Sequence, residues 1–431
     1  MAKPTAVVMN MFYTGLGIAR SLGERGIPVV GLTAERGMYG NFSRYAKTRL
    51  CPDSKRQPEA LLAYLIELGK SLDQRGVIFP TRDHDLVFLD RYRGELAPWY
   101  SIVCPEPDVL EFCLNKWETY LWAQRTNVPT PKAWVIENES GLAGLLDEVT
   151  YPCVLKPLAA HQWRTGRNWM LVGGRKAIPL LNRSELSAEY TVTSQAVKQV
   201  LVQEMIPGHD DCLVTVCCYF DRDSNCVAAF NTRKLAQTPE QFGTGCILQA
   251  AHCPELLEPT IRLLSGMRFT GIAEVEYKWD AANRQYRLIE INPRPWDQHR
   301  LGNSCGVDLI YLAYCEHAGL PLPSFETKRS EDKWIAEDAL ALEALWMVPG
   351  RDPKLRALLQ LARGRRIYAI WSPRDPLPLI AYLGLRFLPQ VVAIVFRSIW
   401  SRVSRSLRPK RSTAAGHAAY GAKLQRGGTN G

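Results

Sequence analysis

The sequence predicts a chain of mixed α/β and α+β class: a doubly wound parallel sheet, then a two-lobed module with antiparallel sheets, then a helical, basic extension. Up to about residue 114, short apolar runs alternate with runs of helical period, which is typical of a parallel sheet. Beyond that point, strands joined by turns predict antiparallel pairing. The length of 431 residues with 46% hydrophobic residues favours several domains with ample core. We expect domains at 1–114, 115–325 and 326–431.

The first domain is predicted to be Rossmann-like. Its strands are expected at residues 5–10, 27–33, 77–80 and 100–105, with helices between them and from about residue 108. The functional residues of such a sheet gather at the C-terminal ends of its strands. By that rule a crevice is lined by Asn10, Thr14, Thr81, Arg82 and Asp83.

Two glycines at the start of the first helix offer an alternative function. Gly15 and Gly17 are compatible with a dinucleotide fingerprint, but Arg20 stands where its third glycine belongs. An NAD(P)-dependent oxidoreductase therefore stays open as an alternative. It leaves the charged residues of the second domain unexplained.

The second domain is predicted from a series of helices, turns and strands. A helix and a Pro-marked turn precede a strand near residue 135, and a strand near residue 155 holds Lys156 in an apolar run. A helix near 182–192, a strand–turn–strand segment, a strand near residue 230, a helix over 254–267 and a hairpin over 271–293 follow. The turn within 203–208 is expected to be the hinge between the two lobes.

The hairpin carries acidic and amide side chains at one end. Alternation along 286–292 places Leu288, Glu290 and Asn292 on one side of the second strand and its isoleucines on the other. The prolines at 293 and 295 end this strand. Antiparallel pairing is expected to bring Glu276 opposite Glu290 and Asn292. Such oxygens suit Mg²⁺, and clustered carboxylates repel one another without a cation.

Basic residues precede and accompany these acids. Lys116, Lys156, Arg233 and Lys234 are suited to phosphate oxygens. Lys156 stands out, because an ammonium in an apolar strand needs an anionic partner. The segment "VLVQEMIPG" is expected to present its backbone and side chains to an adenine edge.

In this order, the lysines, "VLKP", "VQEMIPG", "RKL", "EVEYK" and "IEINPR" resemble the ATP-grasp superfamily over roughly residues 5–320. The resemblance is closest to its branch of carboxylate–amine ligases and carbamoyl-phosphate-synthase-like proteins. It implies ATP and Mg²⁺ (or Mn²⁺) as cofactors, with ATP between two α+β halves. The implied site residues are Lys116 and Lys156 for the phosphates; Gln203, Glu204 and Ile206 for the adenine; Asp211 for the ribose; Lys234 with Arg233 for the γ-phosphate; Glu276, Glu290 and Asn292 for the metal; and Arg294 for the substrate carboxylate or acyl phosphate.

The resemblance also implies a reaction. A carboxylate attacks the γ-phosphate to give an acyl phosphate and ADP, and an amine or similar nucleophile then displaces phosphate. The expected partners are ATP, a small carboxylate and an amine, with no nucleic acid. The acceptor site is expected among Thr14, Arg82, Asp83, His84 and residues 296–300.

The stretch 158–176 departs from the glycine-rich lid of many such enzymes, because Gly166, Gly173 and Gly174 are spread apart. His161, Trp163 and Arg164 are candidates to cover the phosphates with their side chains. Weakened catalysis, as in a non-catalytic nucleotide-binding scaffold on a membrane, is the other alternative.

The extension is strongly basic. Nine basic residues and no acid follow Asp375, so the total of +10 leaves +1 for the first 375 residues, which argues against a nucleic-acid-binding core. The apolar run 387–396 is too short to span a hydrocarbon core of ~30 Å. A helix over 391–408 has apolar residues on one face and arginines on the other, which is typical of an interfacial helix on anionic lipid. Packing on its own core or on a second subunit, as in a homodimer, stays open. Residues 412–431 are predicted to be disordered.

Cysteine usage indicates the compartment. The twelve cysteines are scattered without C-x-x-C or zinc-like spacing, and the N-terminus runs directly into a strand. We therefore expect free thiols in a reducing cytoplasm, with or without peripheral attachment to the cytoplasmic face of the membrane.

Overall fold

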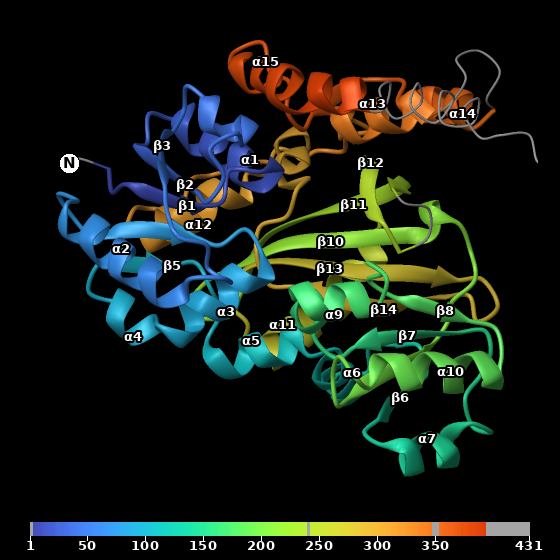
Figure 1. The fold of residues 1–431 in the computed structure, drawn as a ribbon. Coiled ribbons are helices and arrows are strands. Elements are labelled where there is room, and N and C mark those ends of the chain that lie inside the picture. The colour runs from blue at the N-terminus through green and yellow to red at the C-terminus, as the bar shows by residue number, and fades with distance from the viewer. Residues whose placement is uncertain (1–2, 239–241, 347–352, 394–431) are drawn as a thin grey trace, which may run out of the picture.

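The computed structural model describes residues 3–238, 242–346 and 353–393, and three sheets organise them (Figure 1). A five-stranded sheet has the order β3-β2-β1-β4-β5, a four-stranded sheet the order β6-β9-β7-β8, and a seven-stranded sheet the order β14-β13-β10-β11-β12-β15-β16. The predicted class, α/β followed by α+β, is confirmed.

The N-terminal domain is a parallel, doubly wound sheet. From β1 the chain adds β2 and β3 on one side and β4 and β5 on the other, so the order reverses next to β1. Strand β3 was not predicted, because "KTRL" lies at the sheet edge, largely exposed, and shows no apolar alternation. The elements are β1 (Ala6–Met9), α1 (Tyr13–Gly23), β2 (Val29–Thr33), β3 (Lys47–Leu50), α2 (Pro58–Lys70), β4 (Gly76–Phe79), α3 (Asp83–Arg91), α4 (Arg93–Leu96), β5 (Tyr100–Ile102) and α5 (Pro107–Leu114).

The four-stranded sheet forms a small lobe with its own hydrophobic core. Its strands pair antiparallel, and Cys153 and Leu155 of β7 point into that core. The lobe comprises α6 (Lys116–Arg125), β6 (Ala133–Ile136), α7 (Glu139–Leu145), β7 (Cys153–Pro157), α8 (Ala160–Trp163), α9 (Gly166–Leu171), β8 (Ile178–Leu180), α10 (Arg183–Thr193) and β9 (Val200–Glu204).

The seven-stranded sheet, the large sheet below, runs past the boundary expected at residue 325. Strand β15 pairs antiparallel with β12, and β16 pairs parallel with β15. The extension therefore adds two strands to this sheet besides its helices. The elements are β10 (Leu213–Phe220), β11 (Cys226–Thr238), β12 (Thr244–Ala251), α11 (Leu257–Gly266), β13 (Gly271–Asp280), β14 (Gln285–Asn292), α12 (Leu309–His317), β15 (Lys333–Ile335), α13 (Glu337–Trp346), α14 (Pro353–Leu361), β16 (Arg366–Tyr368), α15 (Leu377–Tyr382) and a π-helical turn η5 (Leu383–Phe387).

A β-bulge in the hairpin changes which side chains share a face. Glu276 pairs with Glu290, but Tyr277 pairs with Leu288, so Ile289 is the extra residue. Leu288 consequently joins Ile291 in the core beneath the sheet, whereas Ile289 points to the same side as Glu290. The predicted alternation is therefore wrong for Leu288 and Ile289. The register of Glu276 opposite Glu290 is confirmed, whereas Asn292, also expected opposite Glu276, pairs with Glu274.

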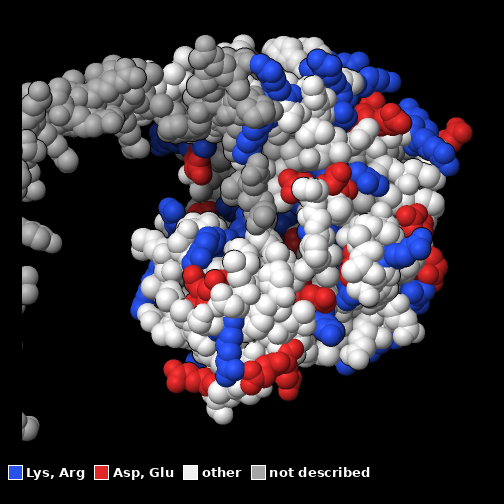
Figure 2. Space-filling model, turned by 90° about the vertical axis from the view of Figure 1, so that its right-hand side faces the viewer, with Lys and Arg blue, Asp and Glu red and all other residues white. Residues whose placement is uncertain are grey.

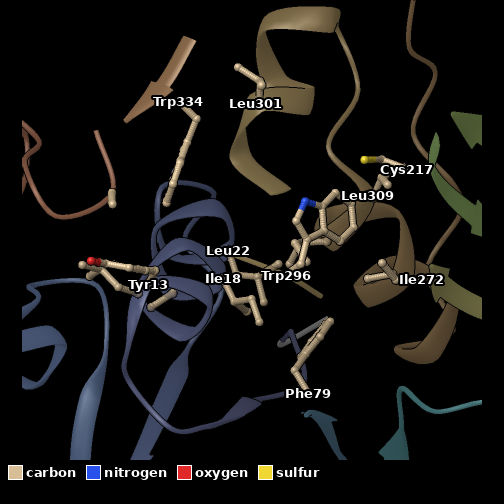
Figure 3. Close-up of a cluster of buried hydrophobic side chains, with 14 of the residues drawn as sticks. Tyr13, Ile18, Leu22, Phe79, Cys217, Ile272, Trp296, Leu301, Leu309 and Trp334 are labelled. Carbon is tan, nitrogen blue, oxygen red and sulfur yellow. The ribbon is translucent and has the colours of Figure 1, made fainter. Parts of the chain in front are cut away.

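One core joins the N-terminal domain, the large sheet and the extension. Helix α1 contributes Ile18 and Leu22, the large sheet Cys217 and Ile272, and the extension Trp334 (Figure 3). Charged residues reinforce this junction. Arg20 of α1 donates to Asp375 with 2.9 Å between Nε and Oδ2, and both side chains are 1% exposed.

Part of the extension prediction lies outside the described residues. The helix predicted over 391–408 is described only to residue 393, and the segment 412–431 not at all. No helix among the described residues is long and apolar enough to cross a membrane. Figure 2 shows basic and acidic side chains interspersed over the described residues of one face, in keeping with the small net charge of the first 375 residues.

Candidate functional site

A cavity of about 520 Å³, here called the interlobe cavity, lies between the small lobe and the large sheet. Charged residues of both walls line it together with apolar side chains, which include Ile206 and Ile289. The predicted site residues among its lining are Lys116, Lys156, Gln203, Ile206, Lys234, Glu276 and Glu290. Residues from six separate segments are thus brought to one cavity.

The small lobe presents Lys156 to this cavity. Alternation along β7 sends Lys156 to the opposite face from Cys153 and Leu155, and the side chain is buried. Its Nζ donates to Oε1 of Gln203 at 3.0 Å, and the hydroxyl of Tyr120 donates to the same oxygen at 2.9 Å. Burial, together with Lys116 nearby, lowers the pKa of Lys156 to about 8. The hydrogen-bond partner of this ammonium among the described residues is a neutral amide, and not the anion that was expected.

The large sheet presents carboxylates that are paired with lysines. Nζ of Lys234 lies 3.0 Å from Oε2 of Glu276, and Nζ of Lys116 lies 3.3 Å from Oε2 of Glu290. Lys116 is held there because the side chain of Asn115 caps the start of α6. Burial alone would raise the pKa of Glu290, but Lys116 and Lys156 lower it to about 2. Glu276 raises the pKa of Lys234 against the effect of burial.

Asn292 and Arg294 continue the site toward the N-terminal domain. Nδ2 of Asn292 donates to Glu290 at 3.4 Å and to Glu274 at 3.3 Å, and its Oδ1 accepts from Arg294 at 3.3 Å. Nε of Arg294 donates to Oδ1 of Asp83, at the start of α3, at 2.6 Å. Arg294 therefore links the large sheet to the crevice of the N-terminal domain. Its guanidinium lowers the pKa of Asp83 against the effect of burial.

The donors predicted for a metal suit a hard cation in their chemistry. Glu276 and Glu290 are direct partners across the hairpin, and Asn292 ends the same strand. In this structure the Asn292 oxygen faces Arg294, while lysines accompany both carboxylates. Within the described residues, no group of three or more His, Cys, Asp or Glu side chains is arranged to hold a metal ion. The predicted set has two carboxylates and an amide, with oxygen donors throughout.

Five predicted residues do not line the interlobe cavity: Asn292 and Arg294, described above, and Glu204, Asp211 and Arg233. The carboxylate of Glu204 accepts from the backbone N–H of Lys132 and pairs with Arg287. Asp211 is exposed, and its neighbour Asp210 lines the cavity instead. Arg233 points to the opposite face of β11 from Lys234 and donates to the backbone oxygen of Asp211 at 3.3 Å.

The lid segment 158–176 contains the short helices α8 and α9. Trp163 is 1% exposed in the core of the small lobe, so it does not cover the cavity as expected. Arg164 does line the cavity. Lys176, which was not predicted, also lines it and donates to Thr244 of β12 at 2.7 Å. The lid thereby spans from the small lobe to the large sheet.

A second cavity of about 400 Å³, the sheet-end cavity, lies at the C-terminal ends of the parallel strands. It adjoins the point where the strand order reverses, where ligands of doubly wound sheets bind. His84 and His161 line it with ring centroids 6.1 Å apart, and Nε2 of His84 and Nδ1 of His161 have no hydrogen-bond partner among the described residues. Arg164 lines both cavities. The charged residues around the sheet-end cavity are Glu35, Asp53, Lys55, Arg56, Arg82, Asp83 and Arg164.

The glycines of the dinucleotide alternative have a packing role. A Cβ at Gly15 would lie 1.9 Å from the backbone oxygen of Asn10, and one at Gly17 would lie 2.5 Å from Nε2 of His299. Both positions therefore need glycine to let α1 pack closely against its neighbours. This explains the G-x-G spacing without a dinucleotide.

Sequence reasoning missed several residues of the interlobe cavity. Lys278 shares a face of β13 with Glu276, so alternation was a usable signal for it. Glu274, which does not line the cavity but accepts a hydrogen bond from Asn292, lies on the same face of β13; burial and Glu276 raise its pKa to about 8. Lys176 and Asp210 carry no pattern that marks them, because their positions depend on the lid and on a short turn.

Comparisons with known proteins agree with this geometry. Residues 116–324 match the family model described as the ATP binding domain of the carbamoyl-phosphate synthase L chain. The D-aspartate ligase of Enterococcus faecium (strain Aus0004) is 22% identical over 299 residues, which cover 66% of this chain and 69% of that protein.

Solved structures share the fold. A biotin carboxylase from Campylobacter jejuni, in a β-γ-ATP complex, superposes with a TM-score of 0.60 at 17% identity and covers 75% of this chain and 74% of its own. An L-amino acid ligase from Bacillus licheniformis gives a TM-score of 0.57 at 14% identity, covering 74% and 75%. The resemblance to the ATP-grasp superfamily is confirmed.

Proposed function

We propose that the chain is an ATP-dependent ligase that activates a carboxylate as an acyl phosphate for attack by an amine. The observation that carries this function is the interlobe cavity itself. It joins Lys116 and Lys156 of the small lobe with Lys234, Glu276 and Glu290 of the large sheet. Lysines on both walls suit the oxygens of a triphosphate, and the match of residues 116–324 to an ATP binding domain supports ATP as that triphosphate.

The apolar and the charged residues that line the cavity position different parts of ATP. The adenine packs between Ile206 and Ile289, which face the cavity from the hinge and from the bulge. Gln203 is fixed by Tyr120 and Lys156, so its amide stands in a defined position beside the ring. The phosphates extend toward the lysines, and Lys234 meets the γ-phosphate.

Glu276, Glu290 and Asn292 are the residues that would hold Mg²⁺. When bound there, the ion neutralises phosphate oxygens as charge moves onto ADP. Lys116 and Lys234, which accompany these carboxylates, are close enough to turn to the phosphates instead. The chain's own part in catalysis is positioning and charge neutralisation, with no nucleophilic side chain.

The reaction has two steps. A carboxylate oxygen of the substrate attacks the γ-phosphorus, the bond from that phosphorus to the β,γ-bridging oxygen breaks, and ADP leaves. The amine nitrogen then attacks the acyl carbon, the bond to the phosphate oxygen breaks, and the amine loses a proton. Arg294, between Asn292 and Asp83, holds the carboxylate and then the acyl phosphate.

The carboxylate substrate enters from the sheet-end cavity. Arg164 lines both cavities, so the two spaces meet at its side chain. Basic residues from the N-terminal domain, Lys55, Arg56 and Arg82, favour an anionic substrate. Asp53 and Asp83 are each paired with an arginine, which reduces their electrostatic repulsion of an anionic substrate.

Nucleotide binding followed by ADP formation tests this function. Mg·ATP is expected to raise the melting temperature of the protein and NADH to leave it unchanged, since a ligand stabilises the state it binds. Carboxylates and amines are then screened in pairs for ADP and phosphate release. Stabilisation by NADH alone would support the oxidoreductase instead. The non-catalytic scaffold would be supported by a different pair of results. Mg·ATP would stabilise the protein, but no ADP would be released with any substrate pair or on addition of a cell extract.

A further inference from the structure

The helix that begins at Leu377 turns an apolar face to the outside. Along residues 377–393 the exposed side chains other than Gln390 are apolar, and Leu377, Ile380, Leu388 and Val392 are each more than half exposed. Gln390 is the one exposed polar residue in this described stretch. Elsewhere on the described surface exposed apolar residues are scattered. The outer face is defined by Leu377, Ile380, Leu383, Leu385, Leu388 and Val392.

The opposite side of this helix is already anchored. Tyr382 is buried and contacts Tyr39 edge-on, with ring centroids 6.0 Å apart. Arg386 donates to the carboxylate of Glu35 and to the backbone oxygen of Gly37. Among the described residues, the outer face is therefore not used for packing within the chain. A contiguous exposed apolar face of this kind marks an interaction surface.

Charge identifies the partner. After Asp375 the sequence has no acidic residue, and its nine basic residues continue past the outer face to residue 426. The same stretch carries Phe396 and Trp400. Apolar and aromatic side chains combined with basic charge are typical of a segment that lies in the interface of an anionic bilayer. No helix among the described residues is long and apolar enough to cross a bilayer.

We infer that the outer face docks the protein on the surface of a membrane that contains anionic lipid. Figure 1 places α15 along one edge of the molecule, away from the small lobe, so the lobe faces away from the bilayer. The anchoring contact also reaches the substrate region, because Glu35 lines the sheet-end cavity. Docking therefore sets that cavity close to the membrane surface.

Vesicle sedimentation of the full chain tests this surface. Binding is expected to vesicles of phosphatidylcholine mixed with phosphatidylserine, and to weaken as salt rises. The double variant Leu388→Ser/Val392→Ser is expected to bind those vesicles at least about tenfold more weakly, because apolar area is no longer buried in the bilayer. Leu181→Ser, an equally exposed leucine of the small lobe, is the matched control and is expected to bind like the native chain.

The readouts separate this surface from other occupants and from the proposed function. Equal sedimentation of the native chain and the double variant, or equal binding to phosphatidylcholine alone, would overturn the proposal. Loss of a dimer in the double variant without any vesicle binding would assign the face to a second copy of the chain. ADP formation without vesicles is expected to be the same in native chain and variant, so failure of vesicle binding leaves the ligase function untouched.

Discussion

The two walls of the interlobe cavity carry buried lysines in opposite electrostatic settings. On the small lobe, Lys156 is bonded to a neutral amide, and its pKa is lowered to about 8. On the large sheet, Lys234 is paired with Glu276, and its pKa is raised. The small lobe thus presents an ammonium, that of Lys156, whose hydrogen-bond partner carries no negative charge. The large sheet presents carboxylates that are already paired with lysines.

This difference explains how one cavity can accept a triphosphate together with a metal ion. Phosphate oxygens supply the negative charge that Lys156 lacks on its own lobe. The carboxylates of the large sheet can exchange a lysine for a divalent cation, since both are positive and the lysine can turn to the phosphate. In the proposed function each wall serves a different component of the ligand, so the two walls can be tested separately.

The largest effect is expected on the acidic wall. Glu290→Gln keeps the shape of the side chain but removes the charge that is placed to hold the metal. We expect kcat for ADP formation to fall by about 10²–10³-fold, as when one preorganised electrostatic group is lost. Steady-state kinetics at saturating Mg·ATP measure this. An unchanged kcat would show that the charge of Glu290 does not contribute to catalysis.

On the basic wall, Lys156→Met is expected to weaken binding of ATP. Loss of a charged hydrogen bond to phosphate should raise the Kd by about tenfold to a hundredfold. Calorimetric titration with a non-hydrolysable ATP analogue measures it. Lys198→Met, at an exposed lysine of the same lobe, is the control and should bind normally. Equal affinity of the two variants would place the phosphates elsewhere.

The two walls are also expected to differ in their response to pH. The lowered pKa of Lys156 means that its ammonium loses its proton above about pH 8, so the affinity for ATP should fall by up to about tenfold per pH unit there. The free energy of unfolding should rise over the same range, from about pH 8 toward the ordinary lysine value of 10.5, because the unfolded chain then holds more protons. Both slopes should be smaller in Lys156→Met. Titrations at several pH values, with denaturant melts beside them, measure this.

The smallest effect is expected at Arg233, which lies next to Lys234 in sequence but on the other face of β11. Arg233→Met should change kcat and KM by no more than about twofold, in line with substitutions outside a site. Loss of activity comparable to that of Lys234→Met would show that both residues act on the γ-phosphate.

The sequence predicts this site well where strand alternation decides the geometry. Glu276 and Glu290 were placed opposite each other because a tight hairpin leaves few registers. Lys156 was singled out because a lysine within "YPCVLKP" needs an anionic partner. The N-terminal sheet followed from alternating strands and helices, and only the polar edge strand β3 escaped notice.

The errors arise where a local irregularity or a distant contact decides the placement. The bulge at Ile289 exchanges the faces of Leu288 and Ile289, and nothing in the residue types signals it. The turn before β10 sends Asp210 rather than Asp211 to the cavity. Trp163 was expected over the phosphates, but burial of a large aromatic ring in the core of the small lobe is favoured over its exposure. Strands β12 and β15 depend on pairing with each other across a long stretch of chain.

The separate core of the small lobe has a mechanical consequence. Its buried residues pack among themselves, whereas the N-terminal domain, large sheet and extension share one core. We therefore expect the sheet of the lobe, β6–β9, to swing about the chain at residues 128–132 and 205–209, while α6 stays on the large sheet, whose core holds its Ala123. Such a swing would admit ATP and release ADP, and it would stretch the Lys176–Thr244 and Lys55–Arg164 contacts first.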